Sequence, residues 1–479
     1  MRELALIAIP LGMAGLAFAW PWEQRRPWFL PLTGAAHVLL TLWLLLVPPA
    51  QAARPWFEFD PLARAVVPMV SVLFLVCAAY SVTYLRLRAE RQNRVFVTAL
   101  LALLGLLCLA LQAQSVGLLW VAAEAATLTT VPLLHFNGTA RAFEATWKYL
   151  LVGGTGIALS LLGAFCLGYA ALGTGSGDLT FAALIASGPA LSHPWLLAAW
   201  VLSLVGYGTK MGLAPMHTWK PDAYGEAPSV VGALLAGGMT SMAFVAVLRI
   251  RQVVDAAGGG VMTERTLLAL GLFSMLVAAL FLLGTPDFKR MLAYSSVEHM
   301  GILSVGAALG GAGLAAALFH VWNNGLTKGA LFLSAGNIRR RAGARTVGEV
   351  AGMAWLSPVS ARLFVVGLFA ITACPPFGPF FSELGIVRAA LTTGHTFSAV
   401  AFLACLLLAF IGLTRLVFAI VDARPRAAAR SQGDRYREVP GVVLPPLVFL
   451  GLSLWLGIGT PPFLQEIWRA AVERLGMTP

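Results

Sequence analysis

The stretch GYGTKMGLAPMHTWKPDAYGEAPS, residues 206–229, leads from an apolar segment to a lysine and then to helix breakers. Lys210 is followed shortly afterwards by Gly212 and Pro215. In lipid, the backbone groups that such a break frees are tolerated only where protein or water satisfies them. The stretch therefore predicts a helix that carries a charge into the membrane and is interrupted at a site inside the protein.

The composition of the whole chain supports a location in the membrane. Hydrophobic residues make up 59% of the 479 residues and charged residues only 11%, whereas soluble domains carry about 25% charged residues. Apolar runs long enough to span a bilayer recur along the chain. The runs cover residues 4–20, 28–49, 62–84, 95–112, 115–136, 148–172, 196–216, 228–250, 266–284, 290–309, 313–337, 359–391, 396–421 and 440–460. We therefore expect an all-α integral membrane protein with about 14 transmembrane helices.

The positive charges alternate between loops in a way that predicts the topology. With residue 1 outside, the inward loops carry most arginines, whereas outward loops such as 173–195 contain no lysine or arginine. The inward arginines include Arg25, Arg26, Arg86, Arg88, Arg91, Arg94, Arg339, Arg340, Arg341, Arg345, Arg424, Arg426, Arg430, Arg435 and Arg437. The positive-inside rule then places both termini on the outer side. The net charge of +12 is a topology signal, with contact to anionic lipid, and we expect no nucleic-acid partner.

The N-terminus allows a second interpretation. Residues 4–19, which end in Ala17-Phe18-Ala19, resemble a cleavable signal peptide. Cleavage would remove one span and reverse every later loop against the arginine bias, so we expect a retained first helix.

The chain shows no signature of a bound cofactor. Its five cysteines lie within the apolar runs without CxxC spacing, as expected for small apolar packing residues. No GxGxxG or P-loop pattern follows a strand-like run. We therefore expect no cofactor, no metal and no redox site in this chain.

Ionisable residues inside apolar runs need a reason, because each costs about 2.5–3.5 kcal/mol on insertion scales. Lys210 and Lys328 fall inside such runs. With a helical rise of about 1.5 Å per residue, Glu124, His299 and Glu383 lie near the middle of the membrane. A desolvated lysine can lose its proton, whereas arginine keeps it. These residues predict a lateral path for protons, although Lys328 is equally compatible with a snorkelling side chain or a static ion pair.

A second break matches the first. In TACPPFGPFFSEL, residues 372–384, three prolines precede Glu383. If residues 95–251 and 265–423 form two five-helix units, each break falls in the fourth helix of its unit, flanked by helices in 1–94 and 439–479. Paired interrupted helices at matching positions indicate inverted repeats with an ion site at their interface. The breaks are assigned to Gly212, Pro215, Pro375, Pro376 and Pro379.

Five stretches resemble one family of membrane subunits. They are VAAEAATLTTVPLLHF (121–136), RAFEATWKYLLVGGTGIALSLLGAF (141–165), GYGTKMGLAPMHTW (206–219), AYSSVEHMGIL (293–303) and CPPFGPFFSELGI (374–386). In this order they resemble the antiporter-like subunits of respiratory complex I, the Mrp cation antiporters and the membrane-bound hydrogenases. The resemblance is greatest to the F subunit of hydrogenase-4-type complexes. It implies a proton-translocating module inside a larger redox complex.

The resemblance also implies roles for single residues. Glu124 on the fifth helix would pair with Lys210 on the seventh, and His299 and Glu383 would continue the path. Lys328 matches a lysine that some relatives carry on the eleventh helix. Further candidates for gating or relay are His217, Thr240, Ser241, Glu298, His320 and Asn324.

The sequence departs from the family pattern in the middle of the path. Many relatives carry a lysine or histidine on the eighth helix, where residues 231–250 offer only Thr240 and Ser241. Asn323-Asn324 replaces the usual histidine before Lys328, with His320 one turn earlier. WKPDAY, residues 219–224, replaces the common W-L-P-D-A-H. Either water carries the proton across this gap, or the path is broken.

The sequence thus predicts a proton-translocating, antiporter-like subunit of a redox-driven complex of hydrogenase-4 or complex I type. We expect it in a bacterial-type cytoplasmic (inner) membrane. Its expected partners are the lipid bilayer, other membrane subunits and a hydrophilic redox arm. Two alternatives stay open: a Na⁺/H⁺ antiporter subunit of the Mrp type, and a non-pumping structural platform, including a partner in inorganic-carbon uptake. Sodium dependence separates the first alternative, and ordered water between Lys210 and Glu383 argues against the second.

Overall fold

The computed structural model describes residues 2–47, 56–175, 177–343, 346–349, 351–422 and 438–476. In these ranges the regular secondary structure is helical, and β-pairing is confined to isolated bridges. The fold is therefore all-α, as the sequence predicts. Some arginines of the predicted inward loops lie outside the described residues, namely Arg345, Arg424, Arg426, Arg430, Arg435 and Arg437.

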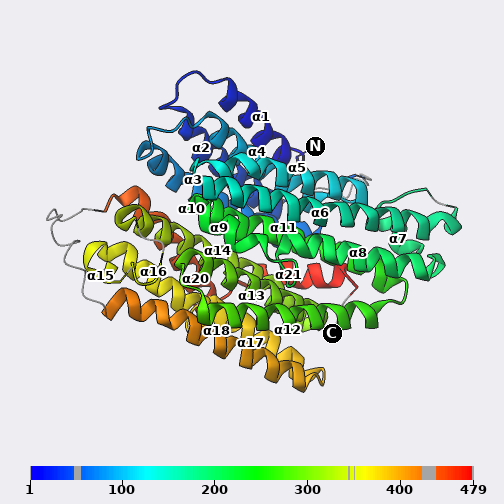
Figure 1. Ribbon diagram of the computed structural model, residues 1–479. Helices are drawn as coiled ribbons and strands as arrows, with labels where there is room; N and C mark the ends of the chain where they lie inside the picture. Colours follow the sequence, from blue (N-terminus) through cyan, green and yellow to red (C-terminus); the bar gives the residue numbers. More distant parts are fainter. Residues whose placement is uncertain are drawn as a thin grey trace.

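The N-terminal helices lie along one side of the molecule (Figure 1). They are α1 (Ala5–Ala19), the short η1 (Arg26–Trp28), α2 (Phe29–Leu46), α3 (Pro61–Arg86) and α4 (Arg94–Gln112). Helix α1 packs against α4, and α2 packs against α3. Pro61 and the capping carboxylate of Asp60 start α3, because Asp60 accepts a hydrogen bond from the Ala63 amide at 2.9 Å.

The middle of the chain contains the first interrupted helix. Its elements are α5 (Val116–His135), α6 (Ala140–Ala171), η2 (Leu172–Thr174), α7 (Phe181–Ala186), η3 (Gly188–Ala190), α8 (His193–Met211), α9 (Trp219–Glu226), α10 (Ser229–Leu234), the π-helical η4 (Leu235–Met239) and α11 (Thr240–Ala256). Helix α8 ends directly after Lys210, and the chain resumes as α9 after seven residues without a helix, 212–218. The predicted span 228–250 is continuous but contains the π-helical segment.

The second half of the chain contains the second interrupted helix. Its elements are α12 (Gly260–Gly284), α13 (Phe288–Ala308), α14 (Gly311–Ala342), α15 (Met353–Leu356), α16 (Pro358–Ile371), α17 (Gly378–Thr392), α18 (Thr396–Asp422), α20 (Pro440–Ile458) and α21 (Pro462–Arg474). The predicted run 359–391 is divided into α16 and α17 by the proline-rich turn. Helix α14 lies in the centre of the bundle, in contact with α3, α10, α13, α16, α17 and α20 (Figure 1).

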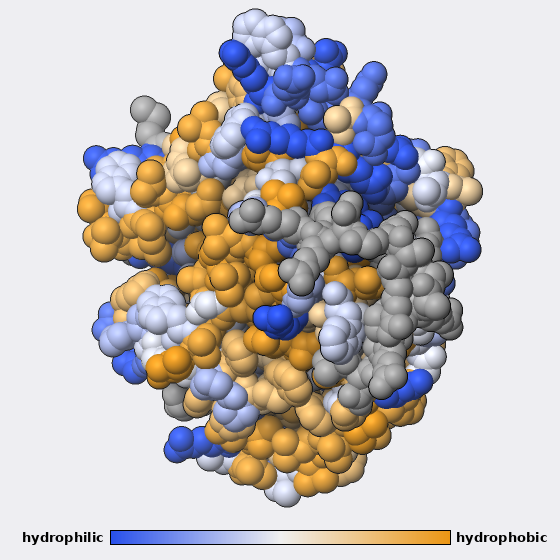
Figure 2. Space-filling view, turned by 90° about the vertical axis from the view of Figure 1, so that its left-hand side faces the viewer, coloured by the Kyte–Doolittle hydropathy of each residue, from blue (hydrophilic) through white to orange (hydrophobic). Residues whose placement is uncertain are grey.

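Nine helices among the described residues are long and apolar enough to cross a membrane, and two shorter ones are apolar. The predicted runs that do not qualify correspond to α1, α8, α13, α14 and the divided pair α16–α17. Helices α8, α13 and α14 miss by composition, because they carry the lysines, histidines and amides of the candidate site. Large hydrophobic side chains such as Leu39, Leu151 and Phe397 are exposed. Figure 2 shows the side of the molecule that lies at the left of Figure 1. Much of this face is also hydrophobic, with hydrophilic residues gathered toward its top.

Candidate functional site

The break after α8 is closed by hydrogen bonds from the protein itself. Gly212 has φ +80°, a left-handed conformation that suits glycine, and its amide bonds to Gly208 O and Thr209 O. The indole of Trp219 donates to Thr209 O at 2.9 Å, and the ammonium of Lys220 donates to Met211 O at 2.5 Å. The carbonyls of Gly208, Thr209 and Met211 at the end of α8 are therefore satisfied inside the protein, as a break in lipid requires.

Lys210 and Glu124 form the first part of the site. The Lys210 side chain is 2% exposed, and its Nζ lies 3.8 Å from Glu124 Oε2 and 2.6 Å from Thr127 Oγ1. Glu124 and Thr127 lie one turn apart on α5, so one helix face holds the ammonium. Among the described residues, Glu124 Oε2 accepts no hydrogen bond. The two charges are thus close but not joined by a hydrogen bond, so the Lys210 ammonium can exchange Glu124 for another partner.

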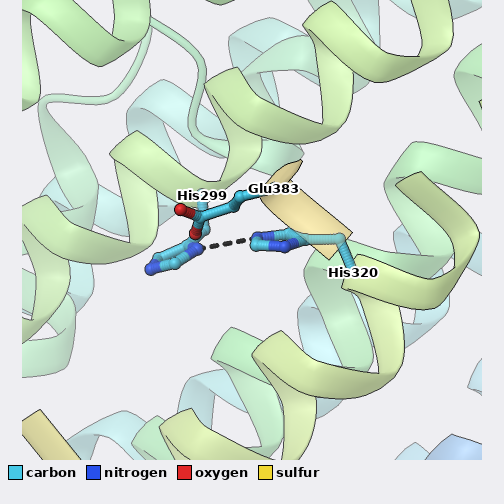
Figure 3. Close-up of side chains that lie close together, drawn as sticks. All are labelled: His299, His320 and Glu383. Atoms are coloured by element: carbon cyan, nitrogen blue, oxygen red, sulfur yellow. Dashed lines mark hydrogen bonds between the residues drawn. The ribbon is translucent and has the colours of Figure 1, made fainter. Parts of the chain in front are cut away.

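The second part of the site is a chain of buried imidazoles. His299 Nδ1 of α13 lies 2.8 Å from His320 Nε2 of α14, and His320 Nδ1 lies 2.9 Å from Ser382 Oγ of α17. Glu383 projects from α17 toward His299 (Figure 3). Within the described ranges, His299 Nε2 and both carboxylate oxygens of Glu383 have no hydrogen-bond partner. A hydrogen-bonded chain of groups that can both donate and accept can pass a proton along it.

Lys328 joins this cluster from α14. It is fully buried, and its Nζ donates to Ser295 Oγ at 2.7 Å and to Leu292 O at 3.3 Å, both on α13. Its side chain therefore points into the bundle and does not snorkel to an interface. Glu298, also buried, interacts electrostatically with Lys328 and with Glu383. The cluster holds acids, imidazoles and an ammonium from three helices.

The second break brings α17 against α14. Pro375 and Pro376 lie in the turn, and α17 begins at Gly378 with Pro379 in its first turn. A Cβ on Gly378 would collide with the amide of Asn323 on α14. The absence of a side chain at Gly378 thus allows the contact that sets Ser382 and Glu383 beside His320.

Thr240 and Ser241, the candidate residues within the predicted span 228–250, donate hydrogen bonds to the backbone of that same span. Thr240 and Ser241 donate to the carbonyls of Ala236 and Gly237 in η4. Asn324 of α14 also donates to Ala236 O, at 3.1 Å. The Asn324 bond joins α14 to the π-helical segment, and the other two bonds leave the hydroxyls of Thr240 and Ser241 as acceptors only.

His217 lies in the first break, buried against the rings of Phe281 and Tyr294. Its Nδ1 has no hydrogen-bond partner among the described residues. The sequence predicts a role for it in gating or relay. The carbonyls at the end of α8 are capped by Trp219 and Lys220.

Lys220 is a buried lysine that was not predicted as a site residue. It follows the first break, outside the apolar runs, and is 0% exposed. The signal was the lysine of WKPDAY, which replaces an apolar residue of the common pattern.

His299, His320 and Glu383 also form the donor set of a metal site, because one ligand atom from each lies within 4.8 Å of the others. Imidazole and carboxylate ligands suit several divalent metals. The two imidazoles are already joined by a hydrogen bond, and Lys328 interacts electrostatically with both rings. A divalent cation at this position would therefore be repelled by that ammonium.

Comparison with known proteins gives the same assignment as the motifs. The sequence profile described as "NADH:quinone oxidoreductase/Mrp antiporter, TM" matches residues 113–409. This range includes the candidate residues Glu124, Lys210, His299, Lys328 and Glu383. The hydrogenase-4 component F homolog of Methylacidiphilum infernorum is 34% identical over 371 residues, covering 76% of each chain. NADH-quinone oxidoreductase subunit N of Desulforudis audaxviator is 32% identical over 416 residues, covering 84% of this chain and 81% of the relative.

Solved structures share the fold at lower identity. A chain of an archaeal membrane-bound sulfane sulfur reductase has a TM-score of 0.89 at 22% identity, with 99% of this chain and 97% of that chain covered. A chain of the Mrp complex from Dietzia sp. has a TM-score of 0.85 at 22% identity, with the same coverage. A chain of complex I from Thermus thermophilus has a TM-score of 0.77 at 23% identity, with 99% and 100% covered. The chain therefore belongs to the NADH:quinone oxidoreductase/Mrp antiporter family of membrane subunits.

Proposed function

We propose that the chain is a proton-translocating subunit of a redox-driven membrane complex of hydrogenase-4 or complex I type. The observation that carries the proposal is the buried Lys210, held by Glu124 at 3.8 Å and by Thr127 at 2.6 Å. An ammonium with an acid as its neighbour keeps its proton, and it becomes costly once that acid moves away. The pair is therefore suited to hold a proton and then to release it.

The size of this interaction is suitable for a pump. Two unit charges about 4 Å apart, at an effective dielectric constant of about 20, interact with roughly 4 kcal/mol. Moving one charge through 100 mV costs about 2.3 kcal/mol. Separating one such pair therefore changes the energy of a proton by an amount comparable with the membrane potential.

The buried cluster of the second half provides the acceptor side of the path. A proton released near Lys210 would reach His299, pass along the imidazole chain to Ser382, and meet Glu383, Glu298 and Lys328. The hydrogen bonds from His299 to His320 and from His320 to Ser382 support this order. The carboxylate oxygens of Glu383, which lack a hydrogen-bond partner among the described residues, are ready to accept a proton.

The same proposal includes the topology. Residues 95–251 and 265–423 would be inverted five-helix units, with residues 1–94 before them and 439–479 after them, in about 14 spans. The breaks at 212–218 and 372–377 support it, because each lies next to a candidate residue: the first follows Lys210 and the second precedes Glu383. The arginine bias supports both termini on the outer side of a bacterial-type inner membrane.

Energy would come from partners. Relatives are named as components of hydrogenase-4 and of NADH-quinone oxidoreductase, so we propose other membrane subunits and a hydrophilic redox arm as partners of this chain. The lipid bilayer surrounds the exposed hydrophobic side chains.

The test is proton translocation by the complex purified through this chain and reconstituted in vesicles. Lys210→Ala and Glu124→Ala should each abolish proton uptake coupled to electron transfer while the complex still assembles. A proton yield equal to that of the unmodified complex in either variant would refute the proposal. Sodium added to the same vesicles separates the Mrp-type alternative, because a sodium-dependent yield would assign the cargo to Na⁺/H⁺ exchange.

A further inference from the structure

Lys220 is a buried cation that lies between the two parts of the site. Its side chain is 0% exposed. Its Nζ donates to Met211 O of α8 at 2.5 Å and to Ser296 O of α13 at 3.4 Å. Among the described residues, no carboxylate pairs with it, and its Nζ lies 5.7 Å from the centroid of the Tyr224 ring. The hydrogen bonds of this ammonium thus go to backbone carbonyls.

The break after α8 creates the place where this ammonium lies. Met211 is the last residue of α8, so its carbonyl belongs to the negative end of the helix dipole, worth about half an elementary charge. Gly212 completes the site, because a Cβ there would lie 2.6 Å from Lys220 Cδ and 2.9 Å from its Nζ. The interruption therefore supplies a partial negative charge where no acid is present.

The position of Lys220 joins the two parts. Met211 follows Lys210 directly, on the side of the first pair. On the other side, Lys220 contacts Ser296 O, while the adjacent Ser295 holds Lys328. His299, one turn further along α13, has an Nε2 without a partner among the described residues, and it interacts electrostatically with Lys220. One ammonium thus contacts the end of the first group and the helix of the second.

The helix that carries Lys220 is firmly held. Asp222 of α9 accepts from Lys148 of α6 at 2.9 Å and pairs with Arg290 of α13 at 2.7 Å. The indole of Trp219 fixes the other end of α9 to Thr209 O. These contacts fix the position of the Lys220 side chain, as a proton carrier requires.

A structural cap alone does not account for a lysine here. Any neutral donor of suitable length would satisfy Met211 O, and a buried charge without an acid is more costly than a neutral group. The charge itself therefore needs a function.

We propose that Lys220 is the middle proton carrier of this chain, a role that rests on the proposed function above. An N–H bond of the ammonium breaks as the proton passes, directly or over water, to His299 Nε2, where a new N–H bond forms. The neutral amine then takes up the proton that Lys210 releases. Lys220 thereby fills the gap in the proton path at the predicted span 228–250, where Thr240 and Ser241 are the only candidates.

The experiment compares Lys220→Gln with Lys220→Arg in the reconstituted complex. Glutamine keeps a donor for Met211 O but is neutral and cannot gain or lose a proton, whereas arginine keeps the charge but does not release its proton. Both variants should assemble, and both should translocate protons about 10²-fold more slowly or worse. Lys220→His, which can gain and lose a proton, should restore part of the rate.

Three results would overturn the inference. Wild-type rates in either the glutamine or the arginine variant would show that a cap or a fixed charge suffices. Failure of both to assemble would make Lys220 a structural residue. The matched control is Lys289→Gln, since Lys289 is also buried and donates to a backbone carbonyl, Ala227 O at 2.7 Å; an equal loss there would mean that any buried lysine matters.

Lys210→Ala, measured beside these variants, separates the two proposals. Pumping that stops in Lys210→Ala but continues in Lys220→Gln refutes the middle carrier alone. Pumping that continues in Lys210→Ala refutes the proposed function.

Discussion

Three buried lysines differ in what each ammonium touches. Lys210 has a carboxylate and a hydroxyl, Lys328 a hydroxyl and a carbonyl, and Lys220 two carbonyls. The sequence, with the family resemblance, indicated the first pair, because Glu124 and Lys210 lie in recognisable motifs. It marked Lys220 only as a departure from the common W-L-P-D-A-H pattern, because the sequence does not show that the break folds this residue back onto Met211. The bond between His299 and His320 likewise depends on how α13 and α14 pack.

Glu383 provides a prediction at this scale. Glu383→Gln should slow proton exchange at its end of the path by about 10²-fold, because the amide cannot ionise. The measurement is the pH dependence of proton release from reconstituted vesicles. Glu466→Gln, an exposed acid on α21, is the control and should behave as the unmodified complex. A normal pH response in Glu383→Gln would contradict its role.

Among the elements, the two interrupted helices were the easiest to predict from the sequence. The low hydropathy of α8, α13 and α14, which carry candidate site residues, was the hardest to predict. Glycine and proline mark both breaks in the sequence, and the structure ends α8 at Met211 and divides α16 from α17. Polar residues lower the hydropathy of α8, α13 and α14, so that they are not among the nine apolar spans of the described residues. The π-helical turn of η4 is not indicated by its sequence, because its five residues are small or apolar.

Gly212 tests the role of the first break. Gly212→Ala should lower both thermal stability and proton rate, because the methyl group would strike the Lys220 side chain. Gly258→Ala is the matched control, since Gly258 has a similar φ of +86° and open space around it. That variant should show only the strain of a left-handed alanine, about 1–2 kcal/mol. Equal effects in the two variants would mean that the contact with Lys220 is unimportant.

For the molecule as a whole, one buried ion pair ties the N-terminal helices to the centre. Asp60, at the start of α3, accepts from both terminal nitrogens of Arg249 of α11, at 2.8 and 3.1 Å, and both residues are buried. The composition predicted an all-α membrane protein, because only lipid can solvate so much apolar surface. The composition could not predict the pair between Asp60 and Arg249, since these residues are 189 positions apart.

Asp60→Ala should therefore destabilise the whole chain by about 3–5 kcal/mol, because it leaves Arg249 buried without its partner. Thermal unfolding of the purified complex in detergent measures the effect. Glu90→Gln removes an exposed partner of Arg88 and should cause no measurable shift. A stability of Asp60→Ala equal to that of the Glu90 variant would contradict the structural role of the pair.

The most direct test of the account is the proton yield per electron pair of the complex that carries Lys210→Arg. Arginine can keep the ion pair with Glu124, yet it does not give up its proton. The account predicts an assembled complex that still transfers electrons while the proton yield of this subunit is lost. A yield unchanged from the unmodified complex would show that Lys210 never releases a proton and would contradict the central claim.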